Sequence, residues 1–266
     1  MGGLSVSKST SNKRWIADSF GLAAPTYDSV AFLQRSVGLK LIDCLPTWSG
    51  SGVVLDVGAG TGHFSRVLQD LYPTAHVIAL DIAEGMLRCA RERFTGACVG
   101  GDAEDLPMAD GSVDLIFSNL AIQWCGSPST ACREFYRVLR PGGHVLFSTF
   151  GPKTLQELRC AWAQVDDLSH VIEFNELKVL EQSLTEAGFS INTIQATVMA
   201  IEYVDVMSLM RELKALGARN LTAGRPRHLT GKNAMARMIS AYPSQDLPGS
   251  TAIHASFEVI AGFASR

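Results

Sequence analysis

The chain has 266 residues, of which 47% are hydrophobic and 18% charged, and its formal net charge is −3. This composition is typical of a globular protein and excludes a mainly disordered, collagen-like or coiled-coil chain. The slight excess of acidic residues argues against general nucleic-acid binding. No apolar run reaches the length of about 18 residues that a transmembrane helix needs, so we expect no membrane span.

The N-terminus over 1–12 is rich in serine and glycine and lacks the apolar stretch of a secretory signal. We therefore expect a disordered lead-in over 1–12 and a single domain over 13–266, in a cytoplasmic protein. Six cysteines are scattered through apolar segments, and no two have C-x-x-C spacing. This pattern is typical of reduced core thiols and argues against a zinc site, so no metal is expected.

From residue 53 onward, short apolar runs alternate with amphipathic stretches. Strands are predicted at 53–57, 76–80, 97–99, 113–118 and 144–150, and helices at 63–71, 86–94 and 131–139. A Pro-Gly-Gly cluster over 141–143 is expected to stop the last of these helices. Strands that alternate with helices indicate right-handed βαβ units in a parallel sheet, and nearly all-apolar strands indicate helices on both faces. The pattern predicts a doubly wound α/β fold, which binds ligands at the carboxyl ends of its strands.

The C-terminal third is less regular. Helices are predicted at 154–165, 176–187, 205–216 and 231–242, and strands at 189–201 and 251–262. Residues from about 203 to 240 precede the last strand, so we expect a helical cap insertion over the edge of the sheet.

A glycine-rich loop follows the first predicted strand and reads G-x-G-x-G over 58–62. Glycines permit a tight turn and a close approach of a ligand to the backbone. The third glycine, Gly62, comes one residue earlier than in the dinucleotide-binding form, and Asp56 lies inside the strand. A carboxylate there suits an amino-bearing ligand better than a pyrophosphate, which prefers free N–H groups and a helix dipole.

Two more acids follow the next two strands. Asp81 ends the second strand, where a carboxylate can accept both hydroxyls of a ribose. Asp102 follows the third strand, where it can accept from an exocyclic amino group such as adenine N6. Together with Asp56, these acids describe a site for an adenosine with a positively charged neighbour, which S-adenosylmethionine fits. The alternative is that each aspartate caps a helix.

The chain resembles the class I S-adenosylmethionine-dependent methyltransferases in LDVGAGTG (55–62), ALD (79–81), GDAEDLPMADGSVDLIFSN (101–119) and EFYRVLRPGG (134–143). The resemblance implies a Rossmann-like, doubly wound α/β fold with a mostly parallel seven-stranded sheet. It implies S-adenosylmethionine as the cofactor and S-adenosylhomocysteine as its product. The implied cofactor-binding residues are Asp56, Gly58, Ala59, Gly60, Gly62, Asp81, Ile82, Met86, Asp102, Ala103, Asn119 and Leu120.

Three further segments resemble one subfamily, the malonyl-[acyl-carrier protein] O-methyltransferases of biotin synthesis. They are SFGLAAPTYD (19–28), SNLAIQWCG (118–126) and LMRELKALGARNLTAGR (209–225). The resemblance implies a helical lid over 13–50, a malonyl-carrying acyl carrier protein as partner, and methylation of the free malonyl carboxylate. We expect a monomer. The alternatives are a methyltransferase for a free acid such as trans-aconitate, a binding protein that has lost catalysis, and an RNA methyltransferase.

Methylation of a carboxylate needs no general base, because the carboxylate is already ionised at pH 7. The site must mainly hold the oxygen near the methyl group and exclude water. Tyr27, Gln123 and Trp124 are the candidates for this positioning role. Packing of Tyr27 and a role of Trp124 as a lid over the cofactor are the alternatives. His63, in the glycine loop, is more readily interpreted as an exposed histidine at a helix start.

The predicted cap is basic. Between 205 and 240 the local charge balance is +5, which leaves −8 for the rest of the chain. A basic patch on an acidic protein indicates an acidic partner, and acyl carrier protein is strongly acidic. The substrate-binding candidates are Arg211, Lys214, Arg219 and Arg225. The alternative is a solvated helix face.

Overall fold

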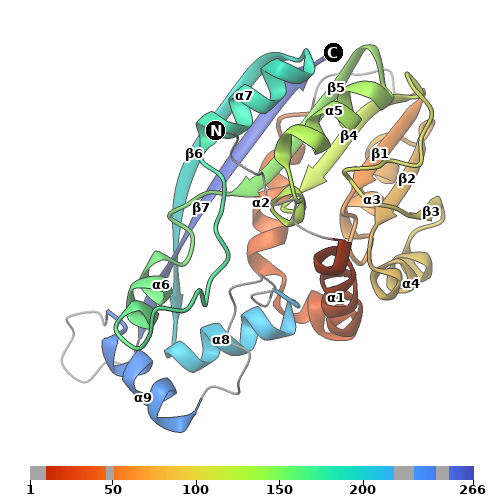
Figure 1. The fold of residues 1–266 in the computed structure, drawn as a ribbon. Helices are drawn as coiled ribbons and strands as arrows, with labels where there is room; N and C mark the ends of the chain where they lie inside the picture. The colour runs from red at the N-terminus through yellow and green to blue at the C-terminus, as the bar shows by residue number, and fades with distance from the viewer. Residues whose placement is uncertain (1–9, 46–50, 219–230, 244–251) are drawn as a thin grey trace.

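The computed structural model describes residues 10–45, 51–218, 231–243 and 252–266 (Figure 1). Seven strands form one sheet with the order β3-β2-β1-β4-β5-β7-β6. The strands are β1 (Val53–Val57), β2 (His76–Asp81), β3 (Ala97–Gly100), β4 (Val113–Asn119), β5 (Leu139–Phe150), β6 (Ser190–Tyr203) and β7 (Ile253–Ser265). β7 runs antiparallel to both of its neighbours, and the other pairs are parallel. The predicted mostly parallel, doubly wound sheet is confirmed.

The described part of the chain contains nine α-helices and one 3₁₀ turn. They are α1 (Thr10–Val30), α2 (Phe32–Ile42), α3 (His63–Leu71), α4 (Glu84–Arg93), η1 (Ile122–Trp124), α5 (Pro128–Val138), α6 (Gln156–Ala163), α7 (Leu177–Ala187), α8 (Val206–Ala215) and α9 (Lys232–Ala241). None of these helices is long and apolar enough to cross a lipid bilayer. The disordered lead-in expected over 1–12 lies largely outside the described residues, but α1 already begins at Thr10.

Two predicted boundaries differ from the structure around α5 and β5. The helix begins at Pro128 because the side chain of Ser127 accepts a hydrogen bond from the backbone N–H of Thr130, and proline suits the first helical turn. It ends at Val138, and Leu139 already pairs with Val113 of β4. The Pro-Gly-Gly cluster therefore lies inside β5 as an irregularity in the pairing, instead of separating helix from strand.

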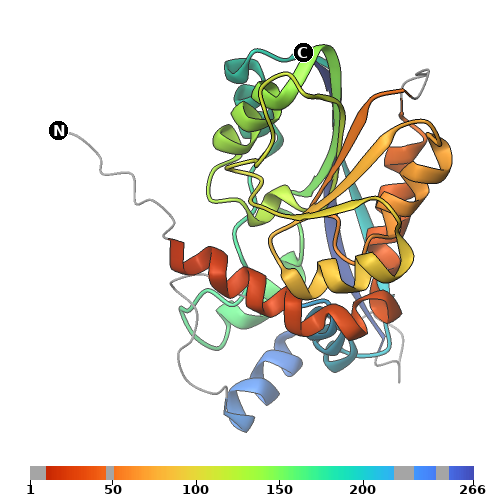
Figure 2. The same cartoon turned by 90° about the vertical axis from the view of Figure 1, so that its right-hand side faces the viewer.

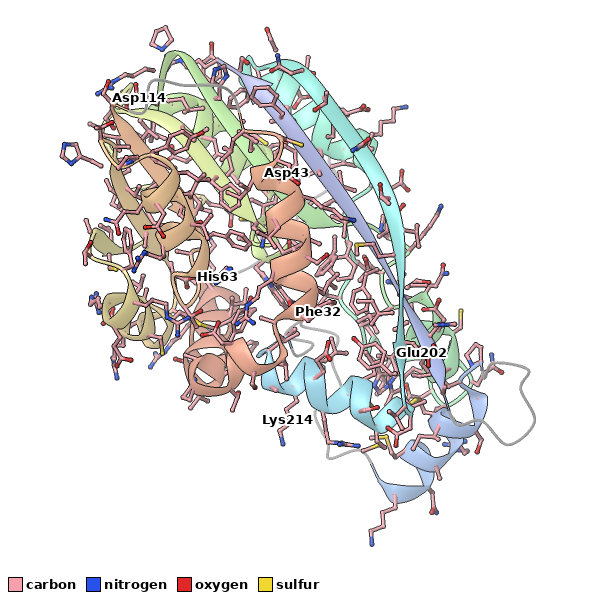
Figure 3. The ribbon with its side chains drawn as sticks, turned by 180° about the vertical axis from the view of Figure 1, so that it is seen from behind. Phe32, Asp43, His63, Asp114, Glu202 and Lys214 are labelled. Carbon is pink, nitrogen blue, oxygen red and sulfur yellow. The ribbon has the colours of Figure 1, made fainter. Side chains whose placement is uncertain are left out.

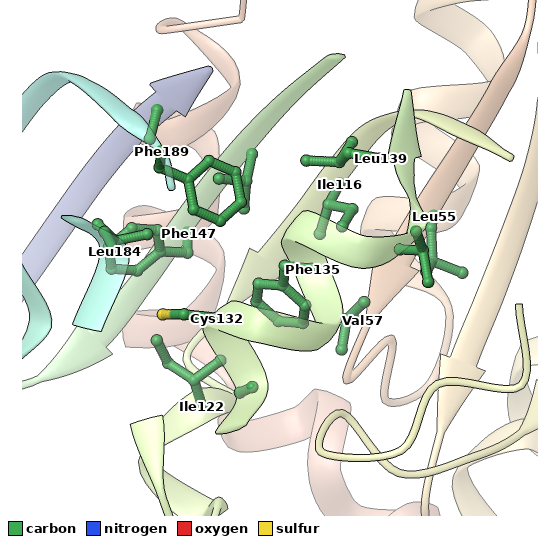
Figure 4. Close-up of a cluster of buried hydrophobic side chains, with 14 of the residues drawn as sticks. Leu55, Val57, Ile116, Ile122, Cys132, Phe135, Leu139, Phe147, Leu184 and Phe189 are labelled. Carbon is green, nitrogen blue, oxygen red and sulfur yellow. The ribbon is translucent and has the colours of Figure 1, made fainter. Parts of the chain in front are cut away.

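Alternate side chains of the central strands pack against helices on opposite faces. Leu55, Ile116 and Phe147 face α5 and α7 in a cluster with Phe135 and Leu184 (Figure 4). On the other face, Val54, Leu115, Phe117 and Leu146 join a cluster with Phe64 and Leu68 of α3 and Leu41 of α2. Apolar side chains of helices cover both faces of the sheet, which explains why the central strands have no polar side.

The antiparallel pair β6–β7 continues beyond the rest of the sheet. β5 pairs with β7 over Val259–Ser265, whereas β6 pairs with β7 as far as Ile253. The extension is covered by α6, α8 and α9, which form a second core around Trp162, Leu209 and Phe257. Helices α8 and α9 lie within the segment predicted as the cap insertion.

Helix α1 lies across the carboxyl end of the sheet, between α4 and the cap (Figure 2). Gly21 of α1 packs directly on Gly85 of α4, because a Cβ at Gly85 would lie 2.5 Å from the carbonyl oxygen of Gly21. At the other side of α1, Ser19 Oγ donates to the carbonyl oxygen of Gly217, which follows α8, at 2.9 Å. These contacts hold α1 over the ends of the strands.

Candidate active site

A cavity lies under α1 at the carboxyl ends of β1, β2 and β4, with about 740 Å³ of empty volume including open solvent. Its lining is mainly apolar and includes Ile16 and Phe20 of α1, and Leu80 and Ile82 at the end of β2. The predicted site residues that line it are Tyr27, Gly58, Gly60, Asp81, Ile82, Met86, Asp102, Ala103, Asn119, Leu120 and Trp124.

The glycine loop turns sharply into this cavity. Gly58 and Gly60 have positive φ values of 75° and 56°, and a Cβ at Gly58 would overlap the Cβ of Ala121. The backbone N–H groups of Gly58 and Ala59 both donate to the carbonyl oxygen of Leu80, at 2.8 and 3.0 Å. These amides are therefore already engaged, which supports the prediction that the loop does not hold a pyrophosphate.

Gly62 lies outside the lining of this cavity and of the second cavity described below. It precedes α3 with a φ of 80°, and a Cβ there would lie 2.8 Å from the Cβ of Ala90 in α4. A side chain at this position would disturb the packing of α3 against α4, which accounts for the glycine. Nothing in its position indicates the predicted contact with the cofactor.

Asp81 is 8% exposed at the end of β2. Its Oδ1 accepts from the backbone N–H of Ala83 and its Oδ2 from that of Gly60, both at 2.8 Å. Burial raises the pKa of this carboxyl, although the backbone hydrogen bonds act in the opposite direction. Each carboxylate oxygen still has a second lone pair, so the side chain can accept from ligand hydroxyls while it fixes the glycine loop.

Asp102 also lines the first cavity and forms an ion pair with Lys13 of α1. The same Lys13 Nζ lies 2.8 Å from Oε2 of Glu104. The Glu104 carboxylate also accepts from the backbone N–H groups of Gly126 and Ser127, each at 2.8 Å. Helix α1 is thereby connected through Lys13 and Glu104 to the start of α5.

A second cavity, with about 420 Å³ of empty volume, adjoins the first and shares Tyr27, Gly58, Gly60 and Asn119 with it. Two predicted cofactor residues, Asp56 and Ala59, line this second cavity instead of the first. Asp56 is 2% exposed, and its Oδ2 accepts from Ser65 Oγ at 2.6 Å. Burial, assisted by the negative charge of Asp81, raises the pKa of Asp56 to about 7.

The segment after β4 is held in a strained conformation. Leu120 has a φ of 50°, which is costly for a residue with a side chain. Its backbone N–H donates to Ser148 Oγ at 3.0 Å, and the same hydroxyl donates to Asn119 Oδ1 at 2.8 Å. Asn119 Nδ2 donates to the carbonyl oxygen of Gln34 in α2 at 2.9 Å. The Asn119 side chain thus connects α2 to Ser148 of β5.

Gln123 and Trp124 occupy one 3₁₀ turn but play different parts. The Gln123 amide is engaged with the carbonyl oxygen of Leu120 at 2.5 Å and with Thr149 Oγ1 at 3.1 Å, and the residue lines neither cavity. Trp124 lines the first cavity and meets Phe20 edge-on, with ring centroids 5.1 Å apart. Of the two, Trp124 is in place to contact a ligand.

The two predicted substrate cations within the described residues, Arg211 and Lys214, line neither cavity. Both are exposed on α8, and Nη2 of Arg211 lies 3.8 Å from Oδ1 of Asp205. Figure 3 shows Lys214 pointing outward from the helix. Arg219 and Arg225 lie outside the described residues. The cations that line the two cavities within the described ranges are Lys13 and Arg35, with His63 as a further titratable group.

Lys13, Gln34 and Arg35 are site residues that the sequence patterns did not single out. Residues 13, 16, 20 and 27 of α1 all line the first cavity. Their helical spacing was a signal that could have identified Lys13. We find no comparable signal for Arg35. Among the described residues, no cluster of three or more His, Cys, Asp or Glu side chains is arranged to hold a metal ion. The expectation of no metal stays a prediction.

The family of the chain follows from comparison with known proteins. A family model described as a methyltransferase domain matches residues 55–147. A malonyl-[acyl-carrier protein] O-methyltransferase of Methylococcus capsulatus is 50% identical over 263 residues, which cover 97% of this chain and 95% of that protein. The chain belongs to this methyltransferase family. It is an S-adenosylmethionine-dependent methyltransferase, as the sequence predicted.

Two further proteins that are similar to this chain are consistent with membership of this family. The biotin biosynthesis bifunctional protein BioHC of Cellvibrio japonicus is 44% identical over 250 residues. The matched region covers 93% of this chain and 49% of that longer protein. The crystal structure of an S-adenosylmethionine-dependent methyltransferase from Mesorhizobium loti is similar in fold, with a TM-score of 0.52 and 20% identity over 86% of this chain and 96% of that one. The fold prediction of a class I methyltransferase is confirmed.

Proposed function

We propose that this enzyme transfers the methyl group of S-adenosylmethionine to the free carboxylate of a malonyl group carried on acyl carrier protein, in biotin synthesis. The observation that carries the proposal is the extent of the 50% identity, which covers 97% of the chain and therefore the cap as well as the cofactor half. The cofactor is expected at the sheet, and the cap is an addition to that sheet. We therefore expect the cap to recognise the substrate.

The residues of the two cavities fit S-adenosylmethionine. We expect Asp102 to accept from the adenine, Asp81 from the ribose and Asp56 from the amino group, and the lining of the cavities by all three supports this. The apolar side chains of Ile82 and Met86 form a wall for the adenine ring. Gly60 leaves room for the ligand, because nothing lies within 4 Å of where its Cβ would be.

Bound S-adenosylmethionine supplies an electrophilic methyl group on its sulfonium. The chain's own residues have to orient the acceptor and exclude water, because an ionised carboxylate needs no base. We expect the edge-on pair of Phe20 and Trp124 to keep water away from the methyl group. Burial and the charges of Asp81 and Asp28 raise the pKa of Tyr27, so its hydroxyl stays protonated at neutral pH and is available as a donor.

The partner and compartment are part of the proposal. The exposed cations of α8 suit an acidic carrier protein. All six cysteines lie in the described part of the chain and none is in a disulfide, which fits a cytoplasmic enzyme. We expect the enzyme to act as a monomer, without nucleic acid or membrane.

The test is methyl transfer from labelled S-adenosylmethionine to malonyl-carrier protein, malonyl-coenzyme A and free trans-aconitate, assayed in parallel. We expect strong labelling of malonyl-carrier protein as a base-labile ester. Acetyl-carrier protein is the matched control, because it lacks the free carboxylate and should stay unlabelled. Labelling of trans-aconitate alone would refute the carrier-protein substrate.

A further inference from the structure

Ser148 is fully buried in β5, where it lies opposite Asn119 in the parallel pairing with β4. Its hydroxyl oxygen and its carbonyl oxygen both accept from the backbone N–H of Leu120, each at 3.0 Å. Leu120 has a positive φ, and a strained residue of this kind persists only where its surroundings hold it. Ser148 therefore supplies two of the contacts that hold the turn after β4.

The Ser148 hydroxyl also determines the orientation of the Asn119 amide. Because the hydroxyl oxygen accepts from Leu120, its single hydrogen is free to donate to Asn119 Oδ1, which lies 2.8 Å away. The amide oxygen is thereby held at the sheet, and Nδ2 donates to the carbonyl oxygen of Gln34 in α2 at 2.9 Å. Without the hydroxyl, the amide has no donor that distinguishes its oxygen from its nitrogen, and the two ends of an amide have nearly the same shape.

Asn119 lies where the two cavities meet, because it lines both of them, as do Tyr27, Gly58 and Gly60. Under the proposed function, the adenosine lies in the first cavity and the amino group in the second, and the sulfonium joins these two parts of the cofactor. The methyl group is therefore expected beside the residues that both cavities share. Tyr27 and Asn119 are the shared residues with polar side chains.

The Asn119 amide has a second N–H that is available at this place. Its nitrogen carries two hydrogens, and the Gln34 carbonyl oxygen is its one acceptor among the residues that the structure describes. The carboxylate of the methyl acceptor has to be held beside the methyl group in a fixed orientation. An N–H group there is complementary to a carboxylate oxygen, whereas an amide turned the other way would present its own oxygen and repel the acceptor.

We propose that Ser148 is a positioning residue for methyl transfer: its hydroxyl fixes the Asn119 amide so that the second N–H of Nδ2 donates to the carboxylate of the methyl acceptor. Ser148 lines neither cavity, so it acts through Asn119 and Leu120. The inference rests on the proposed function in that the acceptor is a carboxylate and the cofactor spans both cavities. It does not depend on which carboxylic acid is methylated.

The test is a double-mutant cycle on kcat with Ser148→Ala, Asn119→Ala and the variant that combines them, with malonyl-carrier protein as the acceptor. We expect Ser148→Ala to lower kcat by about 10- to 100-fold, as a small misplacement of a reacting group does. In the Asn119→Ala background the same replacement should lower kcat by less than about twofold, because the group that Ser148 positions is absent. The Kd for S-adenosylhomocysteine in Ser148→Ala, measured by calorimetry, should rise less than about threefold.

Ser118→Ala is the matched control. Ser118 is equally buried in the neighbouring strand β4, but the single hydrogen of its hydroxyl goes to the carbonyl oxygen of Val57, at 3.0 Å. This variant should lose a comparable amount of stability in urea and keep kcat within about twofold of the wild type. Asn119→Asp gives a second measurement that does not need Ser148→Ala to fold. It keeps the acceptor for Ser148 but replaces the donor by a charged oxygen, so kcat should fall at least about 100-fold.

The proposal is wrong if Ser148→Ala or Asn119→Asp keeps the kcat of the wild type, or if Ser118→Ala lowers kcat as much as Ser148→Ala does. It is also wrong if the replacements of Ser148 and Asn119 act independently in the cycle. A wrong malonyl substrate would show already in the wild type, as an absence of labelling. The cycle is then measured with the free carboxylic acid that the wild type labels.

Discussion

The ammonium of Lys13, in the second turn of α1, lies 2.8 Å from the carboxylate of Glu104, which follows β3. Lys13 also pairs with Asp102, and hydrogen bonds to both acids raise its pKa despite the opposing effect of burial. A helix that covers the cavity is thus held by charge at the end where the adenine is expected. Opening of the cavity requires these ion pairs to separate.

Replacement of Lys13 by methionine should loosen α1 without altering the sheet. A partly exposed ion pair contributes about 1 kcal/mol or less, so the Kd for S-adenosylhomocysteine should rise about fivefold at most. Limited proteolysis within α1 should become faster in the free enzyme. Arg14→Met, at the exposed neighbouring position, is the control. Unchanged proteolysis and affinity in Lys13→Met would show that the ion pairs do not hold the helix.

Gly85→Ala should push α1 away from α4. The new Cβ would lie 2.5 Å from the carbonyl oxygen of Gly21, and backbone cannot move as a flexible side chain does. We expect a loss of about 1–3 kcal/mol in the free energy of unfolding, as for overpacking, together with weaker cofactor binding. Urea denaturation and calorimetry measure the two effects. Gly100→Ala is the matched control, because a Cβ there meets nothing within 4 Å, and an equal loss in both variants would contradict the explanation.

Asp56 should make the stability of the free enzyme depend on pH. Its pKa is raised from the ordinary 3.8 of an aspartate to about 7 in the folded state, so folding favours the protonated form. The stabilisation from this residue is complete below about pH 4 and is lost as the pH rises through 7, by about 4 kcal/mol at most. Asp56→Asn keeps an acceptor for Ser65 and should show a smaller decline between about pH 4.5 and 7.5 in urea denaturation. Identical slopes for the two proteins would show that Asp56 ionises normally.

Charge reversal on the cap should impair use of the carrier protein selectively. Arg211 and Lys214 are exposed on α8, so their replacement by glutamate changes charge without disturbing a core. We expect the KM for malonyl-carrier protein to rise about tenfold, and that for malonyl-coenzyme A to change much less. High salt should have the same effect on the wild type.

The control for these cap variants is a second double variant that makes the same change of charge away from the cap. Arg133 and Lys178 are exposed on α5 and α7, at the opposite end of the molecule from α8. Their replacement by glutamate should leave both KM values near those of the wild type. If the two double variants behave alike, the effect is one of net charge, and α8 is not the docking surface.

Sequence patterns predicted the elements well where neighbouring residues determine them. The strand at 53–57 and the helix at 63–71 have the predicted bounds, since an apolar run, a glycine loop and an amphipathic period follow directly on one another. The acids at strand ends were found for the same reason. Contacts between distant segments were not, because nothing near Lys13 in the sequence indicates an acid 89 residues away. The different roles of Gln123 and Trp124 also depend on neighbours in β5 and α1 that the local sequence does not reveal.

β7 takes part in two cores at once. Its last residues pair with β5 and contribute Ile260 and Ala264 to the core under α5 and α7, while Ala255 and Phe257 pack beneath the cap helices. Because one continuous strand connects the two cores, neither can unfold without removing a wall of the other. The cap and the cofactor half should therefore melt in a single cooperative transition, and a heat-capacity trace should contain one peak whose calorimetric and van't Hoff enthalpies agree.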